Sequence, residues 1–207
     1  MTSAAAPVLV YLHGFLSSPA SAKGRSLEAA ALARGWGFRA PDLNRAPREC
    51  DRVIESLLAD VAREGRAACL AGSSLGGFLA LRAAGRRRIP CVAVNPCLDP
   101  WTHVPALTGE QRVFGTDRVL RVEASFADDF RALEAEAPAA PADPADALIV
   151  LSTADEVLDW RAAAGALSAS PRILSVGDDH RMERFDACLE PVFAFLARRL
   201  RARDRAQ

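Results

Sequence analysis

The amino-acid sequence predicts an α/β fold, with one mostly parallel β-sheet and helices on both of its faces. The first observation is a set of six short runs rich in β-branched and aliphatic residues, each bounded by glycine, proline or polar residues. The second is that the longer stretches between them repeat apolar residues every three or four positions, as amphipathic helices do. Strands that alternate with helices pair in parallel through right-handed crossovers and leave a site at their carboxyl ends.

The six expected strands are largely near-continuous apolar runs, such as VLVYL and LIVLS. Runs of this kind are typical of strands that are buried on both faces of a sheet. The expected strands are residues 8–12, 37–40, 67–71, 91–95, 147–151 and 172–176.

Helices are expected between these strands, in segments whose apolar positions form one stripe. The segments are SLEAAALARG (26–35), CDRVIESLLADVAREG (50–65), LGGFLALRAAGRR (75–87) and DWRAAAGALS (159–168). Residues 185–207 are expected to form a last helix that packs on the sheet and ends in a basic, solvated tail.

Residues 97–146, called the insertion below, break this alternation. They contain no clear strand and end in the Ala/Pro-rich stretch APAAPADPADA. A connection this long within a compact domain is usually functional. We therefore expect a cap or lid over the site, with a short helix near residues 126–136; a passive excursion of the chain is the alternative.

The composition predicts a single domain over residues 1–207 that acts on small molecules. Half of the 207 residues are apolar, which is enough for one well-buried core. The 26 basic and 26 acidic residues balance, so no overall field favours nucleic acid or an anionic membrane. We expect no nucleic-acid or membrane partner, and a monomer or a small homo-oligomer.

The N-terminal stretch MTSAAAPVLVYLHGF has no positively charged region and runs into a glycine turn, as a first strand does and a signal peptide does not. No segment approaches the roughly 20 apolar residues of a membrane span. The five cysteines are odd in number and form no C-x-x-C pair, which argues against a disulfide framework or a zinc knuckle. We therefore expect a cytoplasmic protein with reduced thiols.

The strongest chemical signal is GSSLGG at residues 72–77, which directly follows the apolar run AACLA and directly precedes a helical pattern. This is the context of the G-x-S-x-G nucleophile elbow of α/β-hydrolase folds. Glycines flank the nucleophile because its strained backbone leaves no room for side chains there. Ser74 is the candidate nucleophile, and Ser73 a supporting hydroxyl. An ordinary tight turn or a phosphate-binding loop are the alternatives, although the loop lacks the P-loop lysine and the G-x-G-x-x-G spacing.

A serine hydroxyl needs a general base, usually a histidine held by a carboxylate. In this fold the chain order is serine, acid, histidine, with each on a loop after a later strand. His180, in GDDHRM, follows the last expected strand, whereas His13 precedes the elbow and His103 lies in the insertion. His180 is therefore the candidate base.

The acid is expected after strand 147–151, where STADEVLDW supplies Asp155, Glu156 and Asp159. Asp155 is nearest the end of the strand and is the candidate, whereas Asp159 is also suited to cap the next helix.

An oxyanion hole normally uses one backbone N–H after the nucleophile and one from the loop after the first central strand. Leu75 and Phe15 are the candidates, and Gly14 lets the loop turn towards the substrate. His13 is expected to orient this loop, and we group it with Gly14 and Trp101 as candidate substrate-binding residues. Three apolar side chains of the insertion are expected either to line an acyl pocket or to pack in the core: Trp101, Leu107 and Phe114.

Together these segments resemble the YqiA-like small bacterial esterases of the α/β-hydrolase superfamily. The matching stretches are YLHGFLSSPASAKG, GSSLGGFLA, VNP, TGEQ, ADEVLDW and DDH, which span nearly the whole chain. The resemblance implies a single-domain α/β-hydrolase fold and a carboxylic-ester hydrolase for short or medium acyl chains, without metal or cofactor. It places Ser74, Asp155 and His180 on the triad positions. The chain departs from the family pattern at Ala154, where glycine is usual, and after His180.

Two other functions remain open at this point. The same residues would also serve a thioesterase, a lactonase or an acyltransferase, because one site supports many chemistries. A non-catalytic binding module that kept the fold is the other alternative, although such proteins usually lose a member of the triad.

Overall fold

The computed structural model describes residues 5–205 and contains a central sheet of six strands. The order is β2-β1-β3-β4-β7-β8, and every neighbouring pair is parallel. The predicted α/β fold with a six-stranded parallel sheet is therefore confirmed. The strands are β1 (Val8–Leu12), β2 (Gly37–Arg39), β3 (Ala68–Ser73), β4 (Cys91–Val94), β7 (Ala147–Ser152) and β8 (Arg172–Ser175).

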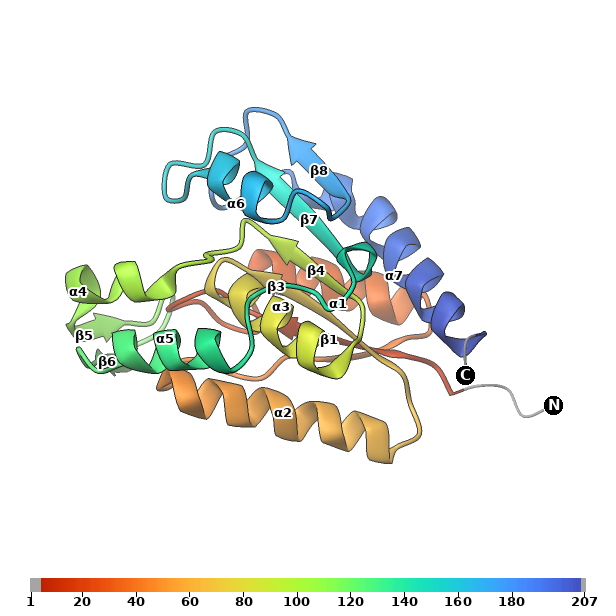
Figure 1. The fold of residues 1–207 in the computed structure, drawn as a ribbon, viewed down its shortest axis with the longest axis horizontal. Coiled ribbons are helices and arrows are strands. Elements are labelled where there is room, and N and C mark those ends of the chain that lie inside the picture. Colours follow the sequence, from red (N-terminus) through yellow and green to blue (C-terminus); the bar gives the residue numbers. More distant parts are fainter. Residues whose placement is uncertain (1–4, 206–207) are drawn as a thin grey trace.

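Helices cover both faces of the sheet, as predicted (Figure 1). One face carries α1 (Ala22–Ala33) and α7 (Leu189–Asp204), preceded by the short η3 (Phe185–Cys188). The other carries α2 (Pro47–Arg63), α3 (Leu75–Arg87) and α6 (Trp160–Ala166). α1 begins four residues before the expected segment because the Ser21 side chain accepts the Gly24 N–H and caps the helix.

Alternate residues of the central strands feed two separate hydrophobic clusters. Val8, Val10 and Leu12 of β1 pack with α2 and α3, whereas Leu9 and Tyr11 pack with α1 and α7. This division follows from the alternation of side chains along a strand. Because both faces are covered, β1 is apolar throughout and fully buried.

The insertion is built from short elements, which begin beyond the carboxyl ends of the strands and finish next to the amino end of β7 (Figure 1). They are η1 (Pro100–Thr102), α4 (Val104–Leu107), β5 (Gly109–Arg112), β6 (Val119–Val122), α5 (Phe126–Glu136) and η2 (Pro144–Asp146). The expected helix at residues 126–136 is confirmed as α5. The expectation of no strand is wrong, because β5 and β6 pair as an antiparallel hairpin. GEQR is polar and half-exposed, so it lacks the apolar run by which the other strands were recognised.

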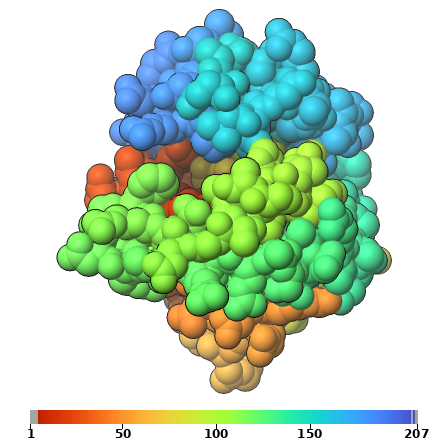
Figure 2. All heavy atoms as spheres, turned by 90° about the vertical axis from the view of Figure 1, so that its left-hand side faces the viewer, coloured from red at the N-terminus to blue at the C-terminus, as the bar shows by residue number. Residues whose placement is uncertain are grey.

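Figure 2 looks onto the carboxyl-terminal side of the sheet and shows the insertion, in green, lying across it between α2 and the blue segment that contains β8. Loops after β1, β3, β7 and β8 therefore meet beneath or beside the insertion. Over residues 5–205, no helix combines the length and hydrophobicity that crossing a membrane requires.

Candidate active site

Ser74 lies between the end of β3 and the start of α3, in a backbone conformation with φ 54° and ψ −119°. A residue other than glycine rarely adopts positive φ, so the local backbone is strained. A Cβ at Gly72 would lie 2.8 Å from the Ala80 Cβ and would overlap the Gly76 carbonyl group. A Cβ at Gly76 would overlap the Leu12 carbonyl group. Close packing of strand, turn and helix thus requires both glycines of the motif.

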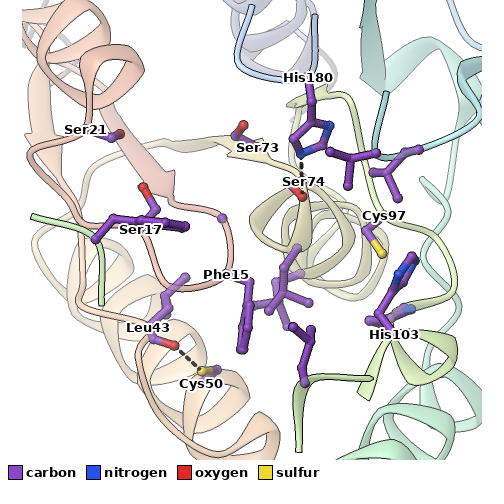
Figure 3. Close-up of a pocket in the computed structure, with 18 of the residues that line it drawn as sticks. Phe15, Ser17, Ser21, Leu43, Cys50, Ser73, Ser74, Cys97, His103 and His180 are labelled. Atoms are coloured by element: carbon purple, nitrogen blue, oxygen red, sulfur yellow. Dashed lines mark hydrogen bonds between the residues drawn. The ribbon is translucent and has the colours of Figure 1, made fainter. Parts of the chain in front are cut away.

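The structure brings together the three residues that the sequence pointed to as nucleophile, base and acid. His180 Nδ1 lies 2.8 Å from Asp155 Oδ2, and His180 Nε2 lies 3.1 Å from Ser74 Oγ (Figure 3). Because Nδ1 faces a carboxylate, it carries the ring proton and donates it, which leaves the Nε2 lone pair to accept the Ser74 hydroxyl. This is the geometry in which an imidazole can deprotonate a serine.

Asp155 is fixed in place by two further hydrogen bonds. Its side chain is only 1% exposed, and its Oδ1 accepts the N–H groups of Val157 at 2.9 Å and Leu158 at 2.8 Å. Asp159 instead accepts the Arg161 N–H and caps α6. Of the three acidic residues that follow β7, Asp155 is the one that reaches the imidazole.

Two residues outside the predicted triad hold the main chain of His180: Glu156, which the sequence offered only as an alternative acid, and Asn95, which it did not single out. Glu156 Oε2 accepts the His180 N–H at 3.0 Å, and this bond lowers the pKa of Glu156. The Asn95 side-chain amide donates to the His180 carbonyl at 3.2 Å and to Ser152 Oγ at 2.9 Å. Asn95 is buried, with φ 43°. The sequence signal for Asn95 is that a polar residue able to adopt positive φ comes directly after a buried strand.

The loop after β1 passes against the elbow. A Cβ on Gly14 would lie 3.3 Å from the Ser74 Cβ, and Gly14 lines the cavity described below. His13 is 1% exposed and lies outside the cavity wall: Nε2 accepts the Leu43 N–H at 2.9 Å and Nδ1 bonds the Gly14 carbonyl at 2.8 Å. Burial lowers the pKa of His13, so the ring is neutral and holds the loop.

The Leu75 N–H comes directly after Ser74, at the start of α3, and the Phe15 N–H comes directly after Gly14 in this loop; both residues line the cavity. Within residues 5–205 neither N–H donates a hydrogen bond to the main chain. Free N–H groups next to a nucleophile can donate hydrogen bonds to an oxyanion and so stabilise its charge, and the N-terminus of α3 adds its dipole.

Ser74 and His180 open onto a cavity of about 860 Å³ with a mainly apolar wall (Figure 3). The insertion supplies Leu107, Phe114 and Phe126 to this wall, among other residues. Trp101 does not line the cavity and packs against the core, so of the three expected apolar residues only Leu107 and Phe114 face it.

Two cysteines, Cys50 and Cys97, also line the cavity. Burial raises the pKa of each thiol to about 12, so both stay protonated near neutrality. All five cysteines are free and buried. Ser74, which alone has a histidine in hydrogen-bond contact, is the better nucleophile of the cavity.

Comparisons with known proteins agree with this architecture. The model of a family described as "Uncharacterised protein family (UPF0227)" matches residues 8–197. The structure of Est1E from Butyrivibrio proteoclasticus is 16% identical, with a TM-score of 0.71 over 96% of this chain and 90% of that one.

Two other solved structures are similarly related. Alpha/beta hydrolase domain-containing protein 10 from mouse is 20% identical, with a TM-score of 0.69 over 93% of this chain and 90% of its own. The esterase domain of a Rhodothermus marinus protein is 20% identical, with a TM-score of 0.65 over 98% of this chain and 88% of that one. At these identities the likeness establishes a shared α/β-hydrolase fold.

Proposed function

Because this chain belongs to the UPF0227 family, the YqiA family, and has the α/β-hydrolase fold, we propose that it is a serine esterase. It hydrolyses short- to medium-chain carboxylic esters through Ser74, His180 and Asp155. The observation that carries the proposal is the hydrogen-bonded series from Asp155 through His180 to Ser74, at 2.8 and 3.1 Å, which opens onto an apolar cavity.

In the first step His180 Nε2 takes the Ser74 proton as Oγ attacks the ester carbonyl carbon. The carbonyl oxygen becomes an oxyanion, and the Leu75 and Phe15 amides stabilise it. Asp155 keeps the imidazole in the required tautomer and stabilises its protonated form. His180 then gives the proton to the leaving alcohol, and an acyl-enzyme remains.

In the second step the same base deprotonates a water molecule, which attacks the acyl-enzyme carbonyl. Collapse of the second oxyanion breaks the bond to Ser74 Oγ, and His180 returns the proton to the serine. The protein's own side chains and amides fill each of these roles, so this route requires no metal or cofactor.

The cavity supports the choice of substrate class. A wall supplied by residues such as Phe126, Phe130 and Leu79 favours burial of an acyl chain, and each buried methylene contributes about 0.8 kcal/mol. In this proposal the insertion acts as the cap over the acyl chain, since its residues form a large part of the wall.

The test is hydrolysis of p-nitrophenyl esters of graded chain length by wild type and Ser74→Ala. We expect the variant to lose at least about 10⁴-fold in kcat. A fluorophosphonate probe should label wild type and Ser73→Ala but not Ser74→Ala, which separates the two adjacent hydroxyls.

Other results would redirect the proposal. Labelling without ester hydrolysis would indicate a thioester, a lactone or acyl transfer as the true chemistry. A folded wild type that is neither labelled nor active would indicate a binding module.

A further inference from the structure

Three side chains at the start of the insertion converge in a way that the esterase chemistry does not use. One ligand atom from each of Cys97, Asp99 and His103 lies within 4.8 Å of the others. Cys97 and His103 both line the cavity, and Figure 3 places them on the same wall, below Ser74. The cluster therefore borders the active site without belonging to the hydrogen-bonded series.

The main chain holds these positions firmly. The Cys97 N–H donates to the Ser74 carbonyl at 3.2 Å, which ties Cys97 to the elbow. The Asp99 carbonyl accepts the Thr102 N–H at 3.0 Å and the Thr102 hydroxyl at 2.8 Å, and the turn of η1 follows. His103 Nε2 lies 3.9 Å from Asp99 Oδ1. Backbone geometry thus brings the three side chains together before any ligand is present.

Thiolate, carboxylate and imidazole are the ligand types that proteins use for zinc. With bonds of about 2.0 Å to nitrogen and oxygen and about 2.3 Å to sulfur, a tetrahedral Zn²⁺ holds such atoms roughly 3.3–3.5 Å apart. The side chains of Asp99 and His103 are 56% and 41% exposed, so they can rotate to close the remaining distance.

From this geometry we infer that Cys97, Asp99 and His103 bind a thiophilic divalent cation such as Zn²⁺, and that the bound ion inhibits the enzyme. As the metal–sulfur bond forms, the Cys97 thiol releases its proton to solvent. The thiolate and the Asp99 carboxylate then balance the charge of the dication, and neutral His103 contributes a lone pair. Three protein ligands leave a fourth position for water or another ligand.

Inhibition follows from where the ion sits, and this part rests on the proposed esterase function. Two of its ligands belong to the cavity wall that also holds Ser74. A hydrated ion on that wall places polar groups where an apolar acyl chain would pack, so substrate binding weakens. We expect Zn²⁺ to raise KM more than it lowers kcat.

Binding is tested first, by titrating the reduced full-length protein with Cd²⁺ and following the ultraviolet absorption of the cadmium–thiolate bond. Wild type is expected to gain this band with one equivalent of Cd²⁺, and Cys97→Ser to lack it. Cys50→Ser is the matched control: Cys50 lines the same cavity, but its thiol donates to the Leu43 carbonyl and it lies outside the cluster. A band in Cys97→Ser, or none in folded wild type, would overturn the site.

Asp99→Asn provides a variant that keeps both the thiol and the cavity wall. Asp99 is exposed and does not line the cavity, so uninhibited ester hydrolysis should stay unchanged. Affinity for Cd²⁺ and Zn²⁺ should fall on the order of tenfold or more, since one charged ligand is lost. Unchanged affinity in a folded variant would exclude Asp99 as a ligand and contradict the three-residue site.

Inhibition is measured as the Zn²⁺ concentration that doubles KM, in wild type and in Asp99→Asn. A tenfold higher value in the variant supports coupling between the ion and the substrate. Equal values would place the inhibitory ion elsewhere, for example on His180, and would overturn this part. If the protein hydrolyses no ester at all, the proposed function fails, while the Cd²⁺ titration still decides the site.

Discussion

The elbow and the insertion both line one cavity, but different forces shape them. At the elbow, backbone atoms approach so closely that Gly72 and Gly76 leave no space for a side chain. In the insertion, short elements such as β5 and β6 leave much of their surface exposed, and side chains such as Phe126 fill the wall. The elbow therefore tolerates little change, whereas the insertion can change the cavity without moving the nucleophile.

The largest loss of activity is expected where the hydrogen-bonded series from Asp155 to Ser74 is broken. In Asp155→Asn the side-chain oxygen can still accept the Val157 and Leu158 amides, but an amide nitrogen would face His180 Nδ1. The imidazole then takes the wrong tautomer, and kcat for ester hydrolysis should fall about 10⁴-fold.

Asp159→Asn is the matched control for Asp155→Asn, because asparagine caps a helix as well as aspartate does. Its activity should stay within about twofold of wild type, and its stability within about 0.5 kcal/mol. Equal losses in the two variants would mean that the proximity of Asp155 to His180 has no catalytic use.

The next largest effect is expected at the glycine that packs the elbow against β1. In Gly76→Ala the new Cβ would overlap the Leu12 carbonyl and lie 2.6 Å from the His13 carbonyl oxygen, so the backbone must shift. We expect a loss of about 3 kcal/mol in the free energy of unfolding, measured by urea denaturation. Activity should fall as well, because Phe15 follows the displaced segment.

Gly165→Ala tests whether the Gly76 effect is steric. Gly165 lies in α6, and an added Cβ there would meet no atom within 4 Å. Alanine should therefore stabilise the protein by about 0.5–1 kcal/mol. If alanine lowered the free energy of unfolding at both positions, the effect at Gly76 would reflect alanine in general rather than close packing at the elbow.

The contrast between the two regions also explains what the sequence could predict. Where backbone packing permits only certain residue types, those types can be read in the sequence. The G-x-S-x-G segment therefore identified Ser74, and the apolar runs identified the six strands of the sheet. Side-chain contacts between distant segments leave no such trace. The Asn95 amide meets His180 85 positions later, and nothing near Asn95 in the sequence announces that partner.

The insertion illustrates the same limit. α5 was predictable because its apolar positions recur at helical spacing and face the core, whereas β5 is polar and half-exposed. Trp101 was a candidate either for the cavity wall or for the core, and the sequence does not show which way η1 turns its side chain; in the structure Trp101 packs against the core.

The free energy of unfolding should depend on pH through His13, which holds the loop after β1. Its pKa is lowered by burial, so the unfolded chain binds a proton at a higher pH than the folded protein does. His13 therefore contributes stability that is fully present above about pH 6.5 and is lost as the pH falls towards the lowered folded pKa. One such proton contributes at most about 1.4 kcal/mol per pH unit to the slope of the free energy of unfolding against pH.

This slope is measured by urea denaturation between pH 5 and pH 7.5, with His13→Gln as the comparison. Glutamine retains an acceptor for the Leu43 N–H but does not titrate, so the variant should show a shallower slope over this interval. The same slope in both proteins would place the titrating group elsewhere.

The smallest effect is expected in the insertion, where substitution should change preference rather than abolish activity. Phe126 is the first residue of α5, is 8% exposed and lines the cavity. Phe126→Ala should lengthen the acyl chain that is hydrolysed best, with kcat/KM for longer esters rising by up to about tenfold relative to short ones. Phe114→Ala is the matched control: Phe114 also lines the cavity but is 70% exposed, so its removal should leave the chain-length profile unchanged. A uniform loss across all chain lengths in Phe126→Ala, with its fold intact by thermal unfolding, would mean that α5 supports the nucleophile as the elbow does. The difference between a rigid elbow and an insertion that adjusts the cavity wall would then disappear.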